Sequence, residues 1–177
     1  LNDILLNDCA LSLFERLLKK YRDDNDTTYM LTKQGRMHID IATFPNKQFY
    51  NGKLDIAGLK HQAENLKNIS IKDDLTRILS SHRVMFFDVN QPETLTNNKI
   101  NYREAEIIAT IIYNIYSEHK DKFIEDETIG VIVPYRNQIA TIKSILQQKY
   151  TEDNLNNITI DTVERFQGSQ RDYIIYG

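Results

Sequence analysis

Hydrophobic residues recur three or four positions apart in three stretches of the chain, the spacing of an amphipathic helix. The first stretch covers residues 12–21 and follows Ser12, which has a glutamate three positions later, the pattern of a capping box. A second and wider stripe covers residues 102–119 and begins with the same spacing at Asn101. A third follows Pro134. These patterns predict three helices.

Short runs of consecutive apolar residues predict buried strands. They lie at residues 29–31, 84–89, 129–133, 158–160 and 173–176. From residue 84 onward, strands alternate with amphipathic helices, an order that indicates a parallel sheet covered by helices on both faces, hence an α/β fold with three layers. Weaker patterns predict a helix end and turn at 44–52, short helical pieces at 60–67 and 73–80, and loops at 91–101 and 153–157.

Clusters of polar residues follow three of these strands. They occupy residues 34–38, 134–138 and 162–172. Because ligands of parallel α/β sheets bind beyond the carboxyl ends of the strands, we expect the three clusters to lie along one edge and to bind a ligand there.

Length and charge narrow the classes of function. The chain has 177 residues, enough for one domain with a sizeable core. Its net charge of −3 argues against tight autonomous binding of nucleic acid, although one basic face of a larger machine stays open.

The cysteine content indicates the redox compartment of the protein, and the chain ends indicate whether it is part of a longer polypeptide. The single cysteine, Cys9, excludes an internal disulfide and favours a reducing, intracellular compartment, and no apolar run approaches the length of a membrane span. The chain begins at Leu1 and stops directly after the last predicted strand, so we expect it to be a piece of a longer polypeptide.

The cluster at 34–38 contains Arg36, whose guanidinium matches phosphate oxygens and keeps its charge. In phosphoryl transfer, such a residue stabilises charge on the transferred group. The alternative is a structural arginine that pairs with a carboxylate such as Asp40. His38 and Asp40 lack further ligands at suitable spacing, so no metal site is expected and His38 is expected to fix the loop by hydrogen bonds.

The other two clusters can also contact phosphates. Pro134, Tyr135 and Arg136 open a predicted helix, where anions bind readily, although a plain helix start with proline in the first position explains them too. Thr162 offers a hydroxyl and Gly168 allows close backbone approach, although an ordinary β-turn also favours glycine. The chain has no Gly-rich phosphate loop, so it cannot hold a complete ATPase site.

Three segments carry a family resemblance that covers the chain from about residue 11 to its end. Thr-Val-Glu-Arg-Phe-Gln-Gly-Ser-Gln-Arg-Asp at 162–172 resembles motif V of superfamily 1 helicases, in the branch that contains the nonsense-mediated-decay RNA helicase and the replicative helicase-nuclease. Gln-Gly-Arg-Met-His at 34–38 is similar to Gln-Tyr-Arg-Met-His-Pro, motif IV of that branch, and Phe-Pro with Phe-Tyr-x-Gly-x-Leu at 44–54 continues the pattern. Residues 129–135 resemble its Gly-Ile-x-x-Pro-Tyr segment.

The resemblance implies the second RecA-like domain of an ATP-dependent helicase, with residues 1–28 packing on it. ATP and Mg²⁺ would lie in a cleft against a first RecA-like domain of the same polypeptide, and single-stranded DNA or RNA would be the partner of a monomer. By resemblance, Arg36 reaches the γ-phosphate. The residues assigned to ATP binding are Gln34, Gly35, Gly168 and Gln170, and those assigned to nucleic-acid binding are Thr162, Pro134, Tyr135 and Arg136.

The chain departs from the family pattern at three positions. Gly35 stands where the family has tyrosine, Ile39 where it has proline, and Gln170 where it has glutamate. A final arginine motif is expected beyond Gly177. These departures leave a second hypothesis open, a degenerate RecA-like module that binds nucleic acid or docks a partner without motor activity. A plain α/β scaffold is the third alternative.

Overall fold

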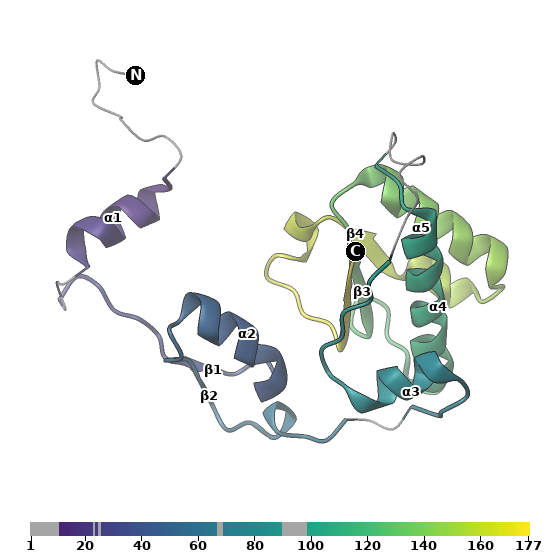
Figure 1. The fold of residues 1–177 in the computed structure, drawn as a ribbon, viewed down its shortest axis with the longest axis horizontal. Coiled ribbons are helices and arrows are strands. Elements are labelled where there is room, and N and C mark those ends of the chain that lie inside the picture. The colour runs from purple at the N-terminus through teal and green to yellow at the C-terminus, as the bar shows by residue number, and fades with distance from the viewer. Residues whose placement is uncertain (1–10, 23, 25, 67–68, 90–98) are drawn as a thin grey trace, which may run out of the picture. The chain divides into compact units, whose positions relative to one another are not determined.

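The computed structural model describes residues 11–22, 24, 26–66, 69–89 and 99–177 (Figure 1). They belong to two compact units, Leu1–Asn65 and Leu66–Gly177. Cys9 and most of the predicted loop at 91–101 lie outside the described residues.

The first unit contains two α-helices and one small parallel ladder. Its elements are α1 (Leu13–Tyr21), β1 (Lys33–Gln34), α2 (Ile39–Phe49), β2 (Asp55–Ile56) and the 3₁₀ helix η2 (Lys60–Gln62). The capping box predicted at the start of α1 is confirmed, because Ser12 Oγ accepts from Glu15 N at 3.2 Å and Glu15 Oε2 accepts from Ser12 N at 2.9 Å. The helix end at 44–52 is confirmed too, with Asn51 and Gly52 both at positive φ in the turn.

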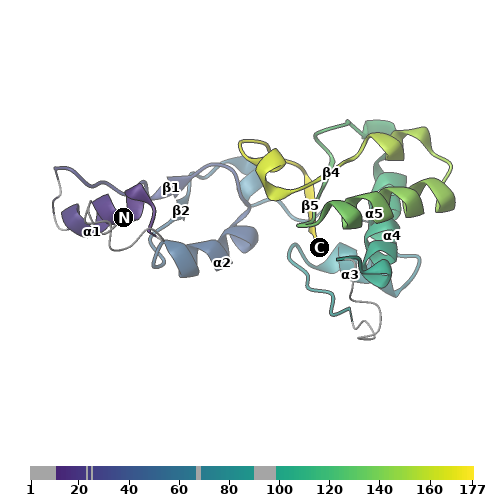
Figure 2. The same ribbon diagram turned by 90° about the horizontal axis from the view of Figure 1, so that it is seen from above.

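The second unit contains a three-stranded sheet (Figure 2). Its elements are α3 (Asp74–Ser81), α4 (Tyr102–His119), η4 (Lys120–Lys122), β3 (Ile129–Ile132), α5 (Arg136–Lys149), η5 (Asp153–Asn157), β4 (Thr159–Asp161), η6 (Val163–Phe166) and β5 (Tyr173–Tyr176). The strands are parallel in the order β4-β3-β5, with Val131 opposite Ile160 and Ile175. The predicted parallel α/β class is confirmed.

Helices α4 and α5 pack on one face of this sheet. Val131 and Val133 are fully buried on that face and share a core with Ile112 of α4 and Ile142 of α5. Alternate residues of a strand point to opposite faces, so Gly130 faces the other side. The segment between β4 and β5 crosses that second face, and Phe166 is its buried side chain.

Three local predictions are wrong. Residues 29–31 form no strand: Tyr29 is 84% exposed, and ladder pairing starts only at Lys33. Residues 84–89 alternate between exposed Val84 and Phe86 and half-buried neighbours, as a strand would, but no strand of the described chain pairs with them. Residues 153–157 form the 3₁₀ helix η5 around buried Leu155 instead of a loop.

Gly130 is the point where the crossing segment touches the sheet. A Cβ added there would lie 2.5 Å from Phe166 Cε1 and 2.9 Å from Arg171 Cγ. We expect Gly130→Ala to lower the free energy of unfolding by about 2–3 kcal/mol, since overpacking forces the covering segment away. Chemical denaturation measures the loss.

Gly35→Ala is the matched change, because the nearest atom to its new methyl group, Leu59 Cδ1, is 3.3 Å away at the end of a flexible side chain. It is expected to be nearly neutral. Wild-type stability of Gly130→Ala would contradict the packing of the crossing segment on β3.

Candidate nucleotide and nucleic-acid site

The loop that carries Arg36 is folded around the side chain of Gln34. Gln34 Oε1 accepts from Arg36 N at 2.9 Å and from Met37 N at 2.7 Å, and Gln34 Nε2 donates to Met37 O at 2.9 Å. One amide therefore satisfies three backbone groups within four residues. Arg36 itself is exposed, so the loop presents its guanidinium at the surface of the unit.

The side-chain amide of Gln62 also forms hydrogen bonds with this loop. Gln62 is fully buried, its Nε2 donates to Gln34 O at 2.8 Å and Met37 O at 3.2 Å, and its Oε1 accepts from Leu59 N at 3.1 Å. Sequence reasoning missed this residue, because it lies in a polar stretch without hydrophobic periodicity. Its amide and that of Gln34 together hold the backbone on both sides of Arg36.

His38 and His61 contribute further hydrogen bonds at this loop. His38 is the N-cap of α2, where its Nδ1 accepts from Asp40 N at 3.1 Å, which confirms that His38 fixes the loop. His61 Nε2 lies 3.0 Å from Gly35 O. Among the described residues, no group of three His, Cys, Asp or Glu side chains is placed to hold a metal ion.

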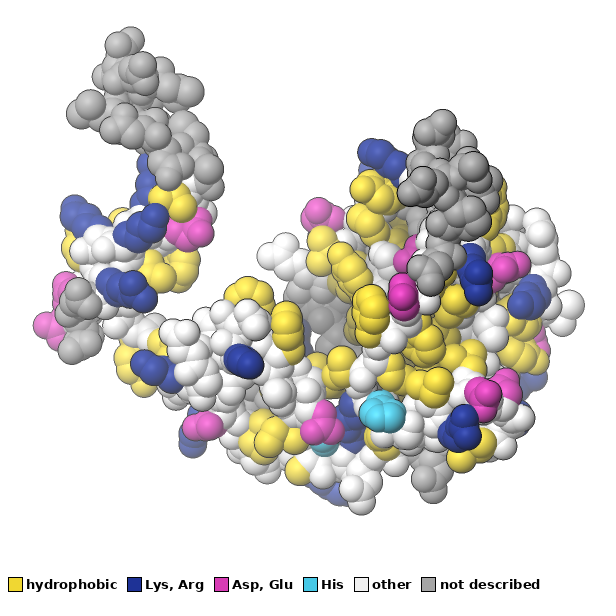
Figure 3. Space-filling view, in the orientation of Figure 1, with side chains coloured by type: hydrophobic (Ala, Val, Ile, Leu, Met, Phe, Trp, Pro, Cys, Tyr) yellow, Lys and Arg dark blue, Asp and Glu magenta, His cyan; other side chains and the backbone are white. Residues whose placement is uncertain are grey.

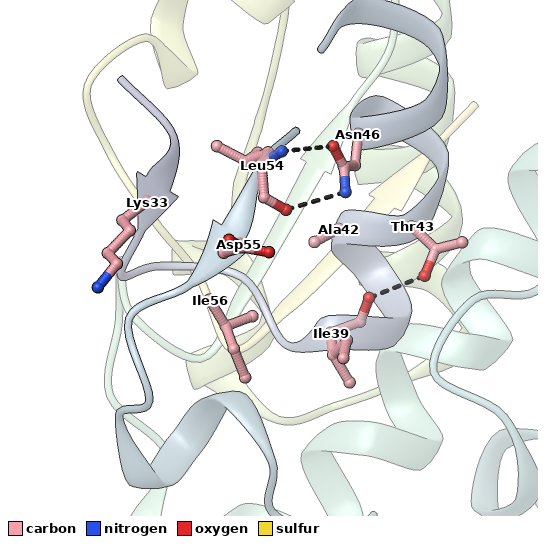
Figure 4. Close-up of a pocket in the computed structure, with 8 residues that line it drawn as sticks. All are labelled: Lys33, Ile39, Ala42, Thr43, Asn46, Leu54, Asp55 and Ile56. Atoms are coloured by element: carbon pink, nitrogen blue, oxygen red, sulfur yellow. Dashed lines mark hydrogen bonds between the residues drawn. The ribbon is translucent and has the colours of Figure 1, made fainter. Parts of the chain in front are cut away.

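A depression of about 500 Å³ opens between α2 and β2 in the same unit (Figure 4). Asn46 spans it, since its Nδ2 donates to Leu54 O at 2.9 Å and its Oδ1 accepts from Leu54 N at 2.8 Å. The lining residues are Lys33, Ile39, Ala42, Thr43, Asn46, Leu54, Asp55 and Ile56. Two of the lining residues, Lys33 and Ile39, directly flank the Arg36 loop in the chain.

In the second unit, the parallel sheet brings two predicted clusters to one edge. Val133 N donates to Asp161 O at 3.1 Å, which places Pro134 beside Thr162 where β3 and β4 end. The sequence-based expectation of a shared edge holds for these two residues. Helix α5 starts there with Tyr135 as its N-cap and Arg136 as its first residue, so proline precedes the cap and does not occupy the first helical position.

Tyr135 is 45% exposed at this edge, and Lys99 Nζ lies 4.9 Å from its ring centroid. A cation over an exposed aromatic ring suits contact with bases and phosphates alike. The sequence alone did not predict a role for Lys99, because only the folded chain brings it next to Tyr135.

The hydroxyl of Thr162 faces a carboxylate. A hydrogen bond from the Thr162 side chain, followed by the backbone of Glu164, lowers the pKa of the exposed Glu164 carboxyl below its ordinary value. Glu164 therefore stays charged near neutral pH.

Helix α4 begins with a variant of the predicted capping pattern. Asn101 Oδ1 accepts from Glu104 N at 3.0 Å, as in a capping box. The return bond is replaced by Gln138 of α5: Asn101 N donates to Gln138 Oε1 at 2.9 Å, and Gln138 Nε2 donates to Glu104 Oε2 at 2.8 Å. Burial raises the pKa of the Glu104 carboxyl, and the hydrogen bond from Gln138 opposes that shift. Gln138, 3% exposed, thereby fixes the start of α4 against α5.

The second half of the 162–172 segment leaves the carboxyl edge. Asp172 N donates to Glu127 O at 2.9 Å, at the opposite end of the sheet, because β5 runs parallel to β4. The expectation that all of 162–172 lines one edge is therefore wrong for its last residues. Gly168 adopts φ +80°, a backbone conformation that favours glycine, and Gln170 is exposed.

A parallel sheet with α-helices on one face and polar clusters beyond β3 and β4 defines an α/β domain of the RecA-like, P-loop NTPase type. A family model described as "AAA domain" matches residues 9–177, and the chain belongs to this family.

The relatives that match most of this chain are much longer. The chain is 30% identical over 169 residues to helicase sen1 of Schizosaccharomyces pombe, covering 93% of this chain and 9% of that protein. It is 29% identical over 181 residues to the DNA polymerase alpha-associated DNA helicase A of Saccharomyces cerevisiae, covering 97% of this chain and 25% of that protein. It is 30% identical over 173 residues to an uncharacterized ATP-dependent helicase of Methanocaldococcus jannaschii (93% and 23%).

The part of the chain that the structure describes contains no helix with the length and hydropathy of a membrane span.

Proposed function

We propose that this chain is the second motor domain of an ATP-dependent nucleic-acid helicase of superfamily 1, in the branch named above. ATP and Mg²⁺ would bind mainly to a first RecA-like domain of the same polypeptide, and the present domain would close over the nucleotide. The proposal draws on the AAA domain family match and on relatives whose names include helicases.

The observation that carries the proposal is the way Arg36 is presented. The Arg36 N–H donates to the Gln34 side-chain amide, and the N–H and carbonyl of Met37 form hydrogen bonds with the same amide. The Gln62 amide donates to the carbonyls of Gln34 and Met37, one on each side of Arg36. A group that stabilises developing charge is most effective when it needs no rearrangement at the moment of reaction. Gln34, Gly35, Gly168 and Gln170 are the further residues that we propose for nucleotide binding.

Single-stranded DNA or RNA would bind across the edge formed by Pro134, Tyr135, Arg136 and Thr162. Tyr135 supplies an exposed ring for stacking on a base, and Thr162 supplies a hydroxyl for a backbone phosphate. ATP-driven closure of two domains around such a strand would move it.

One observation favours the alternative of a binding module without motor activity. Gly35 lacks a side chain where the resemblance expects an aromatic ring. Such a module would bind nucleic acid through Tyr135 and would not couple binding to ATP turnover.

Strand-displacement and ATP-turnover assays of the full-length protein separate the two functions. The motor function predicts ATP turnover that rises on addition of single-stranded DNA or RNA, and unwinding of a duplex with an overhang. Binding of the strand without any stimulated turnover would overturn the motor function and favour the binding module.

A further inference from the structure

Arg171 is the most buried charged side chain of the segment that crosses the second face of the sheet. Its side chain is 9% exposed, its guanidinium carbon lies 5.4 Å from the centroid of the Phe166 ring, and its Cγ would touch a Cβ at Gly130. An arginine in such a place needs partners, because a buried charge without them is costly.

The partners of Arg171 lie at separate points of the fold. Arg171 Nη1 donates to Gln170 O at 2.7 Å, and Arg171 Nη2 lies 3.5 Å from Asp126 Oδ1. Asp126 also accepts from the hydroxyl of Thr159, the first residue of β4. One guanidinium therefore connects the residue before it to the loop that precedes β3 and, through Asp126, to the start of β4.

The third nitrogen of the Arg171 guanidinium, Nε, forms no hydrogen bond with the described residues. This nitrogen is buried. Most buried donors in folded proteins are paired, so an unpaired one calls for a reason. Arg171 Nε is therefore available to an acceptor that the described residues do not supply.

Arg171 contacts the crossing segment at two points, the Phe166 ring and the backbone carbonyl of Gln170. Thr162, at the nucleic-acid end, leads into η6 and the Phe166 ring, which packs against the guanidinium. Gln170, at the nucleotide end, is held through its backbone carbonyl. A shift of η6 would therefore reach Gln170 through the Arg171 side chain, which contacts both.

We propose that Arg171 is a positioning residue that couples the nucleic-acid end of this segment to its nucleotide end. The inference rests on the proposed function. Arg171 touches neither ligand: it sets where Gln170 lies when η6 responds to a bound strand.

The test compares ATP turnover of the full-length protein with and without single-stranded nucleic acid. Arg171→Met keeps the aliphatic stem against Gly130 and Phe166 but removes both hydrogen bonds. We expect stimulation by the strand to fall about tenfold, the scale of a typical coupling between two sites, while the basal rate stays within about twofold of wild type. Arg77→Met, an exposed arginine of α3 paired with Asp74 at 2.7 Å, is the matched control and should behave as wild type.

Arg171→Lys provides the second measurement. It keeps the charge but cannot reach Gln170 O and Asp126 together as the guanidinium fork does, so we expect stimulation between those of wild type and Arg171→Met. This variant also decides the question if Arg171→Met does not fold.

Equal losses of basal and stimulated turnover, or unchanged stimulation, would show that Arg171 is merely structural and overturn the inference. A wild-type protein without any stimulation overturns the proposed function first, and the coupling role with it. The two failures are therefore distinguishable.

Discussion

Replacing Arg36 with alanine is expected to lower ATP turnover of the full-length protein by about 10³-fold, with nucleotide binding retained. The reason is electrostatic: an arginine that reaches the γ-phosphate stabilises charge which develops only in the transition state, and its loss slows the chemical step more than it weakens binding. Steady-state turnover and equilibrium binding of a nucleotide analogue measure the two effects separately.

Two control variants sharpen this test. Arg36→Lys keeps the charge but loses the planar fork, so it should recover only a small part of the lost rate. Arg77→Ala removes an exposed arginine from α3 and should leave turnover unchanged. If Arg36→Ala turns over ATP at the wild-type rate, Arg36 has a structural role and the motor assignment loses the observation that carries it.

Replacing Gln62 with leucine is expected to lower turnover by roughly 10- to 100-fold although Arg36 is unchanged. Leucine is apolar and has no side-chain hydrogen-bonding group, so the change removes the hydrogen bonds to Gln34 O, Met37 O and Leu59 N and frees the loop that aims Arg36. The unpaired buried groups should also cost about 2–3 kcal/mol of stability. Turnover and chemical denaturation of the same variant measure both effects.

Gln148→Leu is the matched control, because Gln148 is exposed on α5 and bonds only to Ser144 Oγ among its described contacts. It should change neither quantity. A Gln62→Leu protein that is destabilised but turns over ATP normally would show that Gln62 supports the fold without positioning Arg36.

The surfaces of both units show hydrophobic side chains (Figure 3). In the first unit, Ala42 and Gln62 are the buried residues among those described, and Phe44 and Phe49 of α2 are 68% and 73% exposed. The sequence pattern alone would have placed such aromatic residues in a core. Their exposure reflects how little surface two short helices and a ladder of two-residue strands can bury.

The elements that sequence reasoning predicted well are those whose signal is local. The helix at 102–119 has the same bounds as α4 after its N-cap, and 173–176 coincides with β5, since a helical stripe and an apolar run are complete within one segment. The strands predicted at 29–31 and 84–89 failed for the opposite reason. An apolar run becomes a strand only if another segment pairs with its backbone, and pairing is a property of the folded chain.

For the candidate site, the sequence by itself determined which residue types stand after each strand: an arginine between Gln34 and Met37, a proline and a tyrosine after β3, and a threonine after β4. Only the tertiary structure decided what holds them. Gln62 reaches Gln34 across 28 positions and Gln138 reaches Asn101 across 37. Arg171 joins Gln170 to Asp126 across 45. Side chains that satisfy distant backbone groups or charges leave no periodic trace in the sequence, because their partners are chosen by where the chain folds back.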